Sequence, residues 1–189
     1  MALLDERGLD ELTTRRIAER LDVRVGTLYW HVKDKRALLT ALADRILAEA
    51  LPDGTPPERP WREHLRDGAH RLRAALLRHR DGARVVAGYA PVSPFMLRMA
   101  ESGLRLMREQ GVPLATAAYA GDTLMSYVTG YVLQEQAEPT GPPDGSALAG
   151  LPLLAEWATT RPAGGDAAFA AGVNFILDGV RTHLAAPSA

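Results

Sequence analysis

The sequence predicts an all-α protein with two parts, a helix-turn-helix domain at residues 1–50 and a second helical domain at residues 51–189. Small and apolar residues recur with the 3.6-residue period of an amphipathic helix over 114–137 and over 169–184. Near the N-terminus, two short helical patterns are separated by a turn, which is the layout of a helix-turn-helix. The alternation of apolar and polar residues that is typical of a strand does not occur, so no sheet is expected.

The first helix is expected to end at Gly8, because glycine commonly closes a helix. A second helix begins at Thr13 or Thr14, since either hydroxyl can accept a hydrogen bond from a free N–H group of the first turn. The inner face of this helix is expected to carry Ile17, Ala18 and Leu21.

A tight turn at residues 22–24 leads into a short helix that runs from Val25 or Gly26 to about His31. Asp34 is then expected to cap a third helix, which continues to about residue 50. These three helices complete the first domain.

Positive charge is concentrated around the two short helices. Residues 13–36 contain seven Arg or Lys against three acidic residues. A local excess of this kind is what a surface facing nucleic-acid phosphates requires. Residues 109–189 contain two Arg against eight acidic residues, so this end of the chain is expected to stay away from DNA.

The second domain is expected to begin after a proline-rich stretch at residues 52–60. Beyond it, the apolar periodicity predicts helices over about 61–79, 83–88, 95–110, 114–137, 153–160 and 166–184. The inner face of the first of these is expected to carry Leu65, Ala69, Leu72, Leu76 and Leu77.

Composition excludes several classes of protein. The chain has no cysteine, so it has no disulfide, thiolate nucleophile or zinc–thiolate site. No apolar run approaches the roughly 20 residues of a membrane span, and the N-terminal residues do not form a secretory signal. These features agree with a cytoplasmic protein that has no membrane partner.

The run LTTRRIAERLDV followed by GTLYWHVKDKRALL resembles the DNA-binding domain of the tetracycline-repressor (TetR) family, and most closely the tetracycline repressors within it. The likeness continues through LRAALLRHRDGARV at 72–85 and YVLQEQ at 131–136. It implies a homodimer in which each protomer places its second short helix in the major groove of a near-palindromic operator. It also implies a small-molecule effector, and pairing of the helices at 114–137 and 166–184 with their copies across a two-fold axis.

The resemblance assigns DNA-binding roles position by position. Its candidates for base contact are Arg15 and Thr27, and its candidates for phosphate contact are Thr14, Tyr29, His31 and Lys35. These residue types suit the two roles, because a guanidinium can bond guanine at two points while hydroxyl, phenol and ammonium groups hold phosphate oxygens.

Two positions of the second short helix depart from the tetracycline repressors. Val25 and Gly26 stand where those proteins carry Gln and Pro. Valine can touch a thymine methyl but cannot read a base through two hydrogen bonds. The operator is therefore expected to differ from the tetracycline operator. Trp30 is interpreted as a packing residue.

The resemblance weakens where the tetracycline repressors hold a drug–magnesium complex. Val86 stands at the position of their metal-ligating histidine, and Gly68 and Gly103 stand where they carry amide side chains. Gln134 stands at the position of a glutamate near the metal. Without imidazole or carboxylate there is little to hold a hard cation. No metal or other cofactor is expected, and tetracycline–magnesium is not the expected ligand.

The remaining side chains near the family's ligand position are mostly apolar or aromatic, and flexible methionines together with tyrosines suit a planar, mostly apolar ligand. The candidate ligand-binding residues are Leu65, Leu72, Val86, Tyr89, Met96, Met99, Gly103, Met107, Met125, Tyr127 and Tyr131. Each of them could equally be an ordinary core residue.

Two other functions compete with a ligand-responsive repressor. An enzyme is not expected, because Ser93, Ser102 and Ser126 have no flanking nucleophile motif and no Gly-rich phosphate loop occurs. A helix-turn-helix regulator without a small-molecule ligand, controlled by a protein partner or by its expression level, stays open as the alternative.

Overall fold

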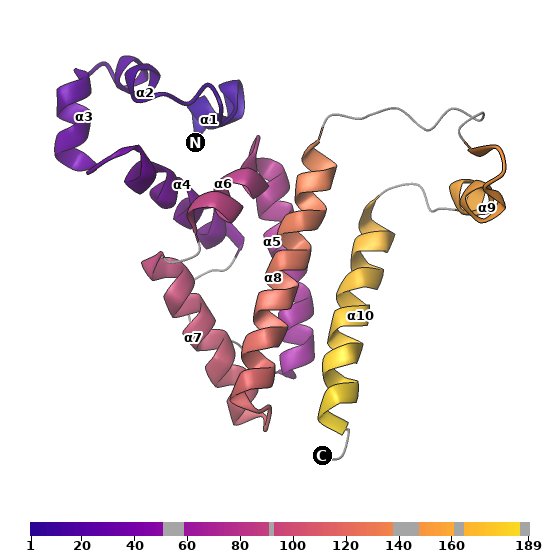
Figure 1. Cartoon of the computed structure of the whole chain (residues 1–189). Coiled ribbons are helices and arrows are strands. Elements are labelled where there is room, and N and C mark those ends of the chain that lie inside the picture. Colours follow the sequence, from indigo (N-terminus) through magenta and orange to yellow (C-terminus); the bar gives the residue numbers. More distant parts are fainter. Residues whose placement is uncertain (51–58, 91–92, 138–147, 161–164, 186–189) are drawn as a thin grey trace.

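The computed structural model describes residues 1–50, 59–90, 93–137, 148–160 and 165–185, and within them it contains helices and no strand. The all-α prediction is therefore confirmed. The elements, shown in Figure 1, are α1 (Ala2–Arg7), α2 (Thr14–Arg20), α3 (Val25–His31), α4 (Lys35–Ala50), α5 (Trp61–Arg78), α6 (Gly82–Tyr89), α7 (Pro94–Glu109), α8 (Leu114–Gln136), α9 (Pro152–Thr160) and α10 (Gly165–Ala185). Most of the proline-rich stretch, residues 52–58, lies outside the described residues.

The helix boundaries near the N-terminus follow the expected caps. Gly8 ends α1 with a φ of 80°, a conformation that is open to glycine. Thr13 precedes α2, and its hydroxyl accepts a hydrogen bond from the N–H of Arg16 at 3.3 Å. Oδ1 of Asp34 accepts from the N–H of Ala37 at 2.7 Å, which caps α4. The inner face predicted for α2 is wrong at one position, since Leu21 is exposed.

The main core lies where α4, α5, α6, α8 and α10 meet. Ile46, Leu76, Val128 and Phe169 are fully buried there, each from a different helix. Burying a side chain of this size stabilises the fold by about 1.5–3 kcal/mol. On α5 the predicted inner face is confirmed at Ala69, Leu72 and Leu76 and wrong at Leu77, which is exposed.

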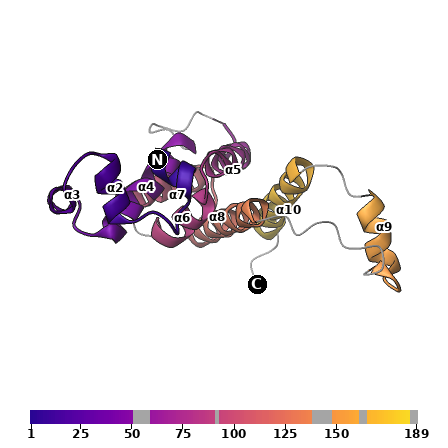
Figure 2. The ribbon, with the colours of Figure 1, turned by 90° about the horizontal axis from the view of Figure 1, so that it is seen from above.

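The helices form a body with two projecting parts (Figures 1 and 2). We call residues 1–50 the head and the helices α5–α8 with α10 the body. Within the body, α8 lies beside α10 in both views, and α7 packs on the other side of α8. Helix α3 lies at one end of the molecule, and α9 lies at the other end, apart from the bundle.

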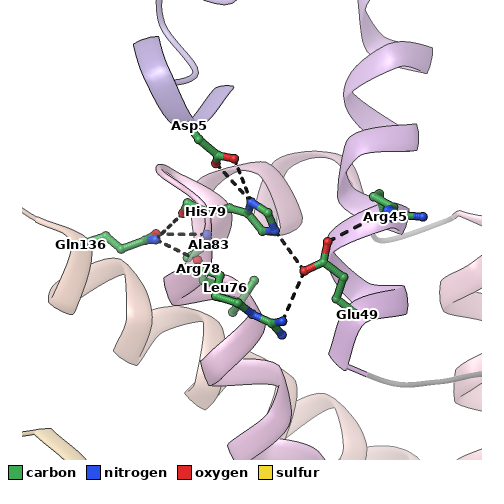
Figure 3. A network of polar contacts seen from close by, with 8 residues as sticks. All are labelled: Asp5, Arg45, Glu49, Leu76, Arg78, His79, Ala83 and Gln136. Carbon is green, nitrogen blue, oxygen red and sulfur yellow. Dashed lines mark hydrogen bonds and ion pairs between the residues drawn. The ribbon is translucent and has the colours of Figure 1, made fainter. Parts of the chain in front are cut away.

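Polar contacts attach the head to the body. The side chains of Asp5 in α1 and Glu49 in α4 both reach His79, which follows the last turn of α5 (Figure 3). Beside them, Arg84 of α6 forms an ion pair with Asp10 at 2.8 Å. This hydrogen-bonded guanidinium holds the pKa of the Asp10 carboxyl below its usual value. These polar contacts at the junction of α5 and α6 add to the apolar core that α4 shares with the body.

Candidate functional site

The surface of the head is formed by α2 and α3, which pack together and leave most of α3 exposed. Ala18 of α2 and Leu28 of α3 are the residues that these two helices bury. The candidate DNA-binding residues lie on the exposed part: Arg15, Val25, Gly26, Thr27, Tyr29, His31 and Lys35 are exposed, and Thr14 is half-buried. The structure thus collects all eight on α2, α3 and the first residue of α4.

Ion pairs within the head neutralise part of its positive charge. Arg15 lies 3.0 Å from Glu19, and Arg20 lies 2.8 Å from Glu6. Arg16 also forms an ion pair, with Glu11. The acids at positions 6 and 11 precede the basic stretch, so counting charges over 13–36 overestimates the charge that is available to DNA.

Three other basic residues close to α3 form no ion pair with a described residue. Arg24, Lys33 and Lys35 have no ion-pair partner among the described residues. Two of these, Arg24 and Lys33, are absent from the predicted DNA-binding residues. Arg24 immediately precedes α3 and Lys33 follows it, so they flank the helix at its two ends. Their positions beside the exposed helix were visible in the sequence, but their lack of acidic partners was not.

The interpretation of Trp30 as a packing residue is wrong. Its side chain is 90% exposed, on the same helix as the exposed Tyr29 and His31. An aromatic ring with so little burial contributes little to the packing of the head.

A cavity of about 680 Å³ lies in the body between α5, α7 and α8. Its wall is mostly apolar, which suits a small organic ligand. Seven of the candidate ligand-binding residues line it, namely Leu65, Leu72, Met96, Met99, Gly103, Met107 and Met125. Phe95, Leu104, Leu124 and Val128 complete the larger apolar part of the wall.

The other four candidates lie outside this cavity wall. Val86 is buried in the main core, and Tyr89 lies under the guanidinium of Arg36, whose Cζ is 5.9 Å from the ring centroid. Tyr127 and Tyr131 point to the opposite side of α8, where they donate hydrogen bonds to backbone carbonyls of α10 at 3.1 and 2.9 Å.

The two tyrosines belong to an aromatic cluster between α8 and α10. The ring of Phe169 stacks on Tyr127 with centroids 5.6 Å apart and meets the edge of Tyr131 at 5.2 Å. The Arg73 guanidinium lies over the Phe169 ring at 4.9 Å and is paired with Glu135 at 2.5 Å. Burial in this cluster raises the pKa of Tyr127 above its usual value.

Basic side chains interrupt the apolar wall of the cavity, and sequence reasoning did not select them. Arg59, His64 and Arg71 are three of these lining residues. Neighbouring Leu65 and Leu72 were selected by their apolar character, whereas histidine and arginine on an amphipathic helix resemble solvent-facing residues. The spacing was nonetheless a signal, because positions 64 and 71 lie on one face of a helix.

A second apolar surface is exposed along α8 and α10. Tyr119 and Phe175, the latter 76% exposed, border a groove between these helices. Ile176 and Val180 form its floor and also pack on the core of the same chain. An exposed apolar surface that spans two long helices is typical of an interface between protein chains.

Two further classes of site do not occur in the described parts of the chain. No helix there is both long and apolar enough to cross a membrane. Within the same residues, no group of three or more His, Asp or Glu side chains could hold a metal ion.

Comparisons with known proteins agree along the whole chain. The protein-family model described as "Bacterial regulatory proteins, tetR family" matches residues 1–42, and the family model described as "Tetracyclin repressor-like, C-terminal domain" matches residues 52–184. The class A tetracycline repressor of transposon 1721 from Escherichia coli is 42% identical over 185 residues, covering 94% of this chain and 85% of that protein.

Two solved structures add to this agreement. A variant of TetR from Acinetobacter baumannii AYE, in complex with minocycline, superposes with a TM-score of 0.79 at 36% identity, covering 100% of this chain and 92% of that one. BioQ with its double-stranded DNA operator superposes with a TM-score of 0.69 at 32% identity, covering 96% and 93% of the two chains. The chain belongs to the tetR family of bacterial regulatory proteins.

Proposed function

We propose that this DNA-binding transcriptional regulator is a homodimeric repressor, released from its operator by a small planar, mostly apolar ligand bound in the cavity of the body. The observation that carries the proposal is the large apolar cavity between α5, α7 and α8 in a chain whose other end exposes α3. The BioQ complex supports the DNA-binding half, because it shows a relative on its operator. Catalysis has no part in this function, and the proposed location is the cytoplasm.

The exposed groove of α8 and α10 supports the homodimer. A two-fold axis through this surface would pair each helix with its own copy, so that every contact is made twice. Burial of Tyr119 and Phe175 would then remove two large aromatic side chains from water. Two heads held in this way can contact successive major grooves about 34–36 Å apart.

Helix α4 supports communication between the cavity and the head. Its first turn carries Arg36, which covers Tyr89 of α6, and its last residue, Ala50, accepts a hydrogen bond from Nε of Arg71 at 3.1 Å. Arg71 also lines the cavity. A ligand that moves Arg71 therefore acts directly on the C-terminal end of α4, and a small rotation of α4 changes the separation of the heads. The ligand shifts the equilibrium only as far as it prefers one arrangement of the dimer.

The ligand is proposed to act without magnesium. Val86 occupies the position of the metal-ligating histidine in the tetracycline repressors, and it is buried away from the cavity. The cavity wall is mostly apolar, and Asp122 is the only carboxylate among the described lining residues, which is too few oxygen ligands for a hard cation. The minocycline complex of the Acinetobacter baumannii relative describes that protein, so tetracycline with magnesium is the comparison compound for this chain.

The test is a gel shift with the DNA that flanks the gene, with scrambled DNA as the control. The repressor account expects specific binding that weakens as salt rises, since phosphate neutralisation releases counterions. Polycyclic aromatic compounds should release the complex in the presence of EDTA. Specific binding that no compound of any class reverses would favour the regulator without a small-molecule ligand.

A further inference from the structure

We infer that the ligand of this cavity carries an anionic oxygen group, a carboxylate on an apolar aromatic body, and that Arg59, His64 and Arg71 receive it. This inference rests on the proposed ligand-responsive function and specifies the ligand's chemical class. It comes from the basic side chains in the otherwise mostly apolar wall of the cavity.

His64 and Arg71 project from one face of α5 into the same cavity. They are seven residues apart, which places them within about 20° of the same direction and about 10 Å apart along the helix axis. Gly68 lies between them on this face and also lines the cavity. Because glycine has no side chain, the space between the imidazole and the guanidinium is left open to a ligand.

Arg59 is held at the cavity by its neighbours. Nη1 of Arg59 lies 2.5 Å from Oδ2 of Asp67, one turn beyond His64 on α5. Its carbonyl oxygen accepts a hydrogen bond from Nε2 of Gln110 at 3.0 Å, and Oε1 of Gln110 accepts from the N–H of Trp61 at 2.8 Å. The side chain and backbone of Arg59 are thus fixed before a ligand arrives, which lowers the entropic cost of binding.

Two polar atoms of these side chains, Nε of Arg59 and Nδ1 of His64, are buried and have no hydrogen-bond partner among the described residues. A buried polar group without a partner costs free energy, and a ligand relieves that cost when the two side chains turn to meet it. The Nε–H of arginine can only donate. A ligand oxygen is therefore the complementary group, and a ligand ammonium is not.

The charged residues that line the cavity are mostly positive, which also favours an anionic ligand. Arg59, Arg71 and Arg98 are cationic, and among the described lining residues only Asp122 is acidic. Asp67 offsets one positive charge through its pair with Arg59. An anionic group is favoured at such a surface, and the apolar wall beyond it selects an aromatic body in preference to a small polar anion.

His64 should take up a proton when the acid binds. Burial, together with the charges of Arg59 and Arg71, lowers the pKa of His64 below its ordinary value, against a smaller opposing effect of Asp67. In the free protein the imidazole is therefore neutral at pH 7. A carboxylate beside it favours the imidazolium and raises its pKa in the complex, so the affinity for the acid should rise as the pH falls from about 8 to about 6.

The experiment compares matched ligands, anthracene-2-carboxylate and anthracene-2-carboxamide, by isothermal titration calorimetry on the full chain. The acid should bind at least about tenfold more tightly than the amide, as expected for a hydrogen-bonded charge. His64→Gln and Arg59→Gln should each remove most of this preference and leave the affinity for the amide within about twofold. The rise in affinity at lower pH should be seen for the acid only, and it should disappear in His64→Gln.

His70→Gln is the matched control, because His70 lies on the same helix, is exposed, and packs against Phe169 instead of lining the cavity. Thermal melting checks that each variant is folded. Equal affinities for acid and amide in the wild type, an acid preference that survives in both variants, or no binding of either compound would overturn the inference. If the acid binds but does not release operator DNA, the site for an anionic ligand stands and the proposed ligand-released repressor function is contradicted.

Discussion

Nδ1 of His79 lies 3.1 Å from Oδ1 of Asp5, so the end of α5 in the body is bonded directly to the first helix of the head. On the other side of the same ring, Nε2 lies 3.1 Å from Oε2 of Glu49 in α4 (Figure 3). Arg45 and Arg78 approach Glu49 as well, at 4.0 and 3.7 Å. One buried imidazole thus contacts both helices that connect the head to the body.

The first prediction concerns this junction. His79→Ala should leave Asp5 and Glu49 without their buried partner and lower the free energy of unfolding by about 1–3 kcal/mol. Hydrogen exchange should quicken in α1 before it quickens in α5, because α1 is short and loses its attachment. Arg105→Ala is the control, since it removes only an exposed pair with Glu101 at 3.3 Å and should cost less than about 1 kcal/mol. Equal exchange rates in α1 before and after His79→Ala would show that other contacts hold the helix.

The second prediction separates phosphate contacts from base contacts. Arg24→Ala and Lys35→Ala should weaken binding to operator and scrambled DNA by similar factors and reduce the salt dependence of binding. Thr27→Ala should instead change the preference among operator variants. Gel-shift titrations at several salt concentrations measure both effects. If Thr27→Ala lowers the affinity for every sequence equally, it is not a base-reading residue.

The third prediction concerns the dimer. Phe175→Glu places a charge on the groove of α8 and α10 at a position that is exposed in the single chain, and symmetry repeats the change. Light scattering should show monomers with an unchanged helical spectrum, and operator affinity should fall at least about tenfold, since a monomer holds only one half-site. Leu97→Glu is the control, because Leu97 is an exposed leucine on α7. An intact Phe175→Glu dimer would place the interface elsewhere.

The fourth prediction concerns the close approach of α8 and α10. A methyl group added at Gly172 would overlap the phenol of Tyr127, which is held by its hydrogen bond to Phe169. Gly172→Ala should therefore destabilise the fold by about 1–3 kcal/mol. Gly88→Ala has no atom near the added methyl group and should be neutral or stabilising by up to about 1 kcal/mol. Denaturant melts compare the two, and equal stabilities would mean that Tyr127 can move at little cost.

The helices could be predicted from the sequence because their caps and periods are local signals. Thr13, Asp34 and Gly8 act within one turn of their own positions, and the structure places all three helix ends close to the expected residues. The exposed residues of α3 could be selected for the same reason, since its single buried side chain, Leu28, fixes which face is free.

The side of α8 that faces the cavity could not be predicted, because this helix is covered on more than one side. Met125 and Tyr127 both belong to its broad apolar stripe, yet they differ by about 200° around the helix axis. The structure directs Met125 into the cavity and Tyr127 toward α10. Ion pairs between distant segments, such as Arg20 with Glu6, were hidden for a similar reason, since pairing depends on packing and not on local composition.

The measurement that tests the central claim most directly is the release of fluorescently labelled operator DNA, followed by anisotropy, from wild-type protein and Met99→Ala. A planar apolar aromatic compound should release the wild type equally well with and without EDTA. Met99→Ala should need a higher concentration, because a methionine that lines the cavity is truncated, and its ligand-free operator affinity should be unchanged. If tetracycline is the only compound that releases the DNA, and EDTA abolishes that release, the account is contradicted and the ligand is a drug–magnesium complex.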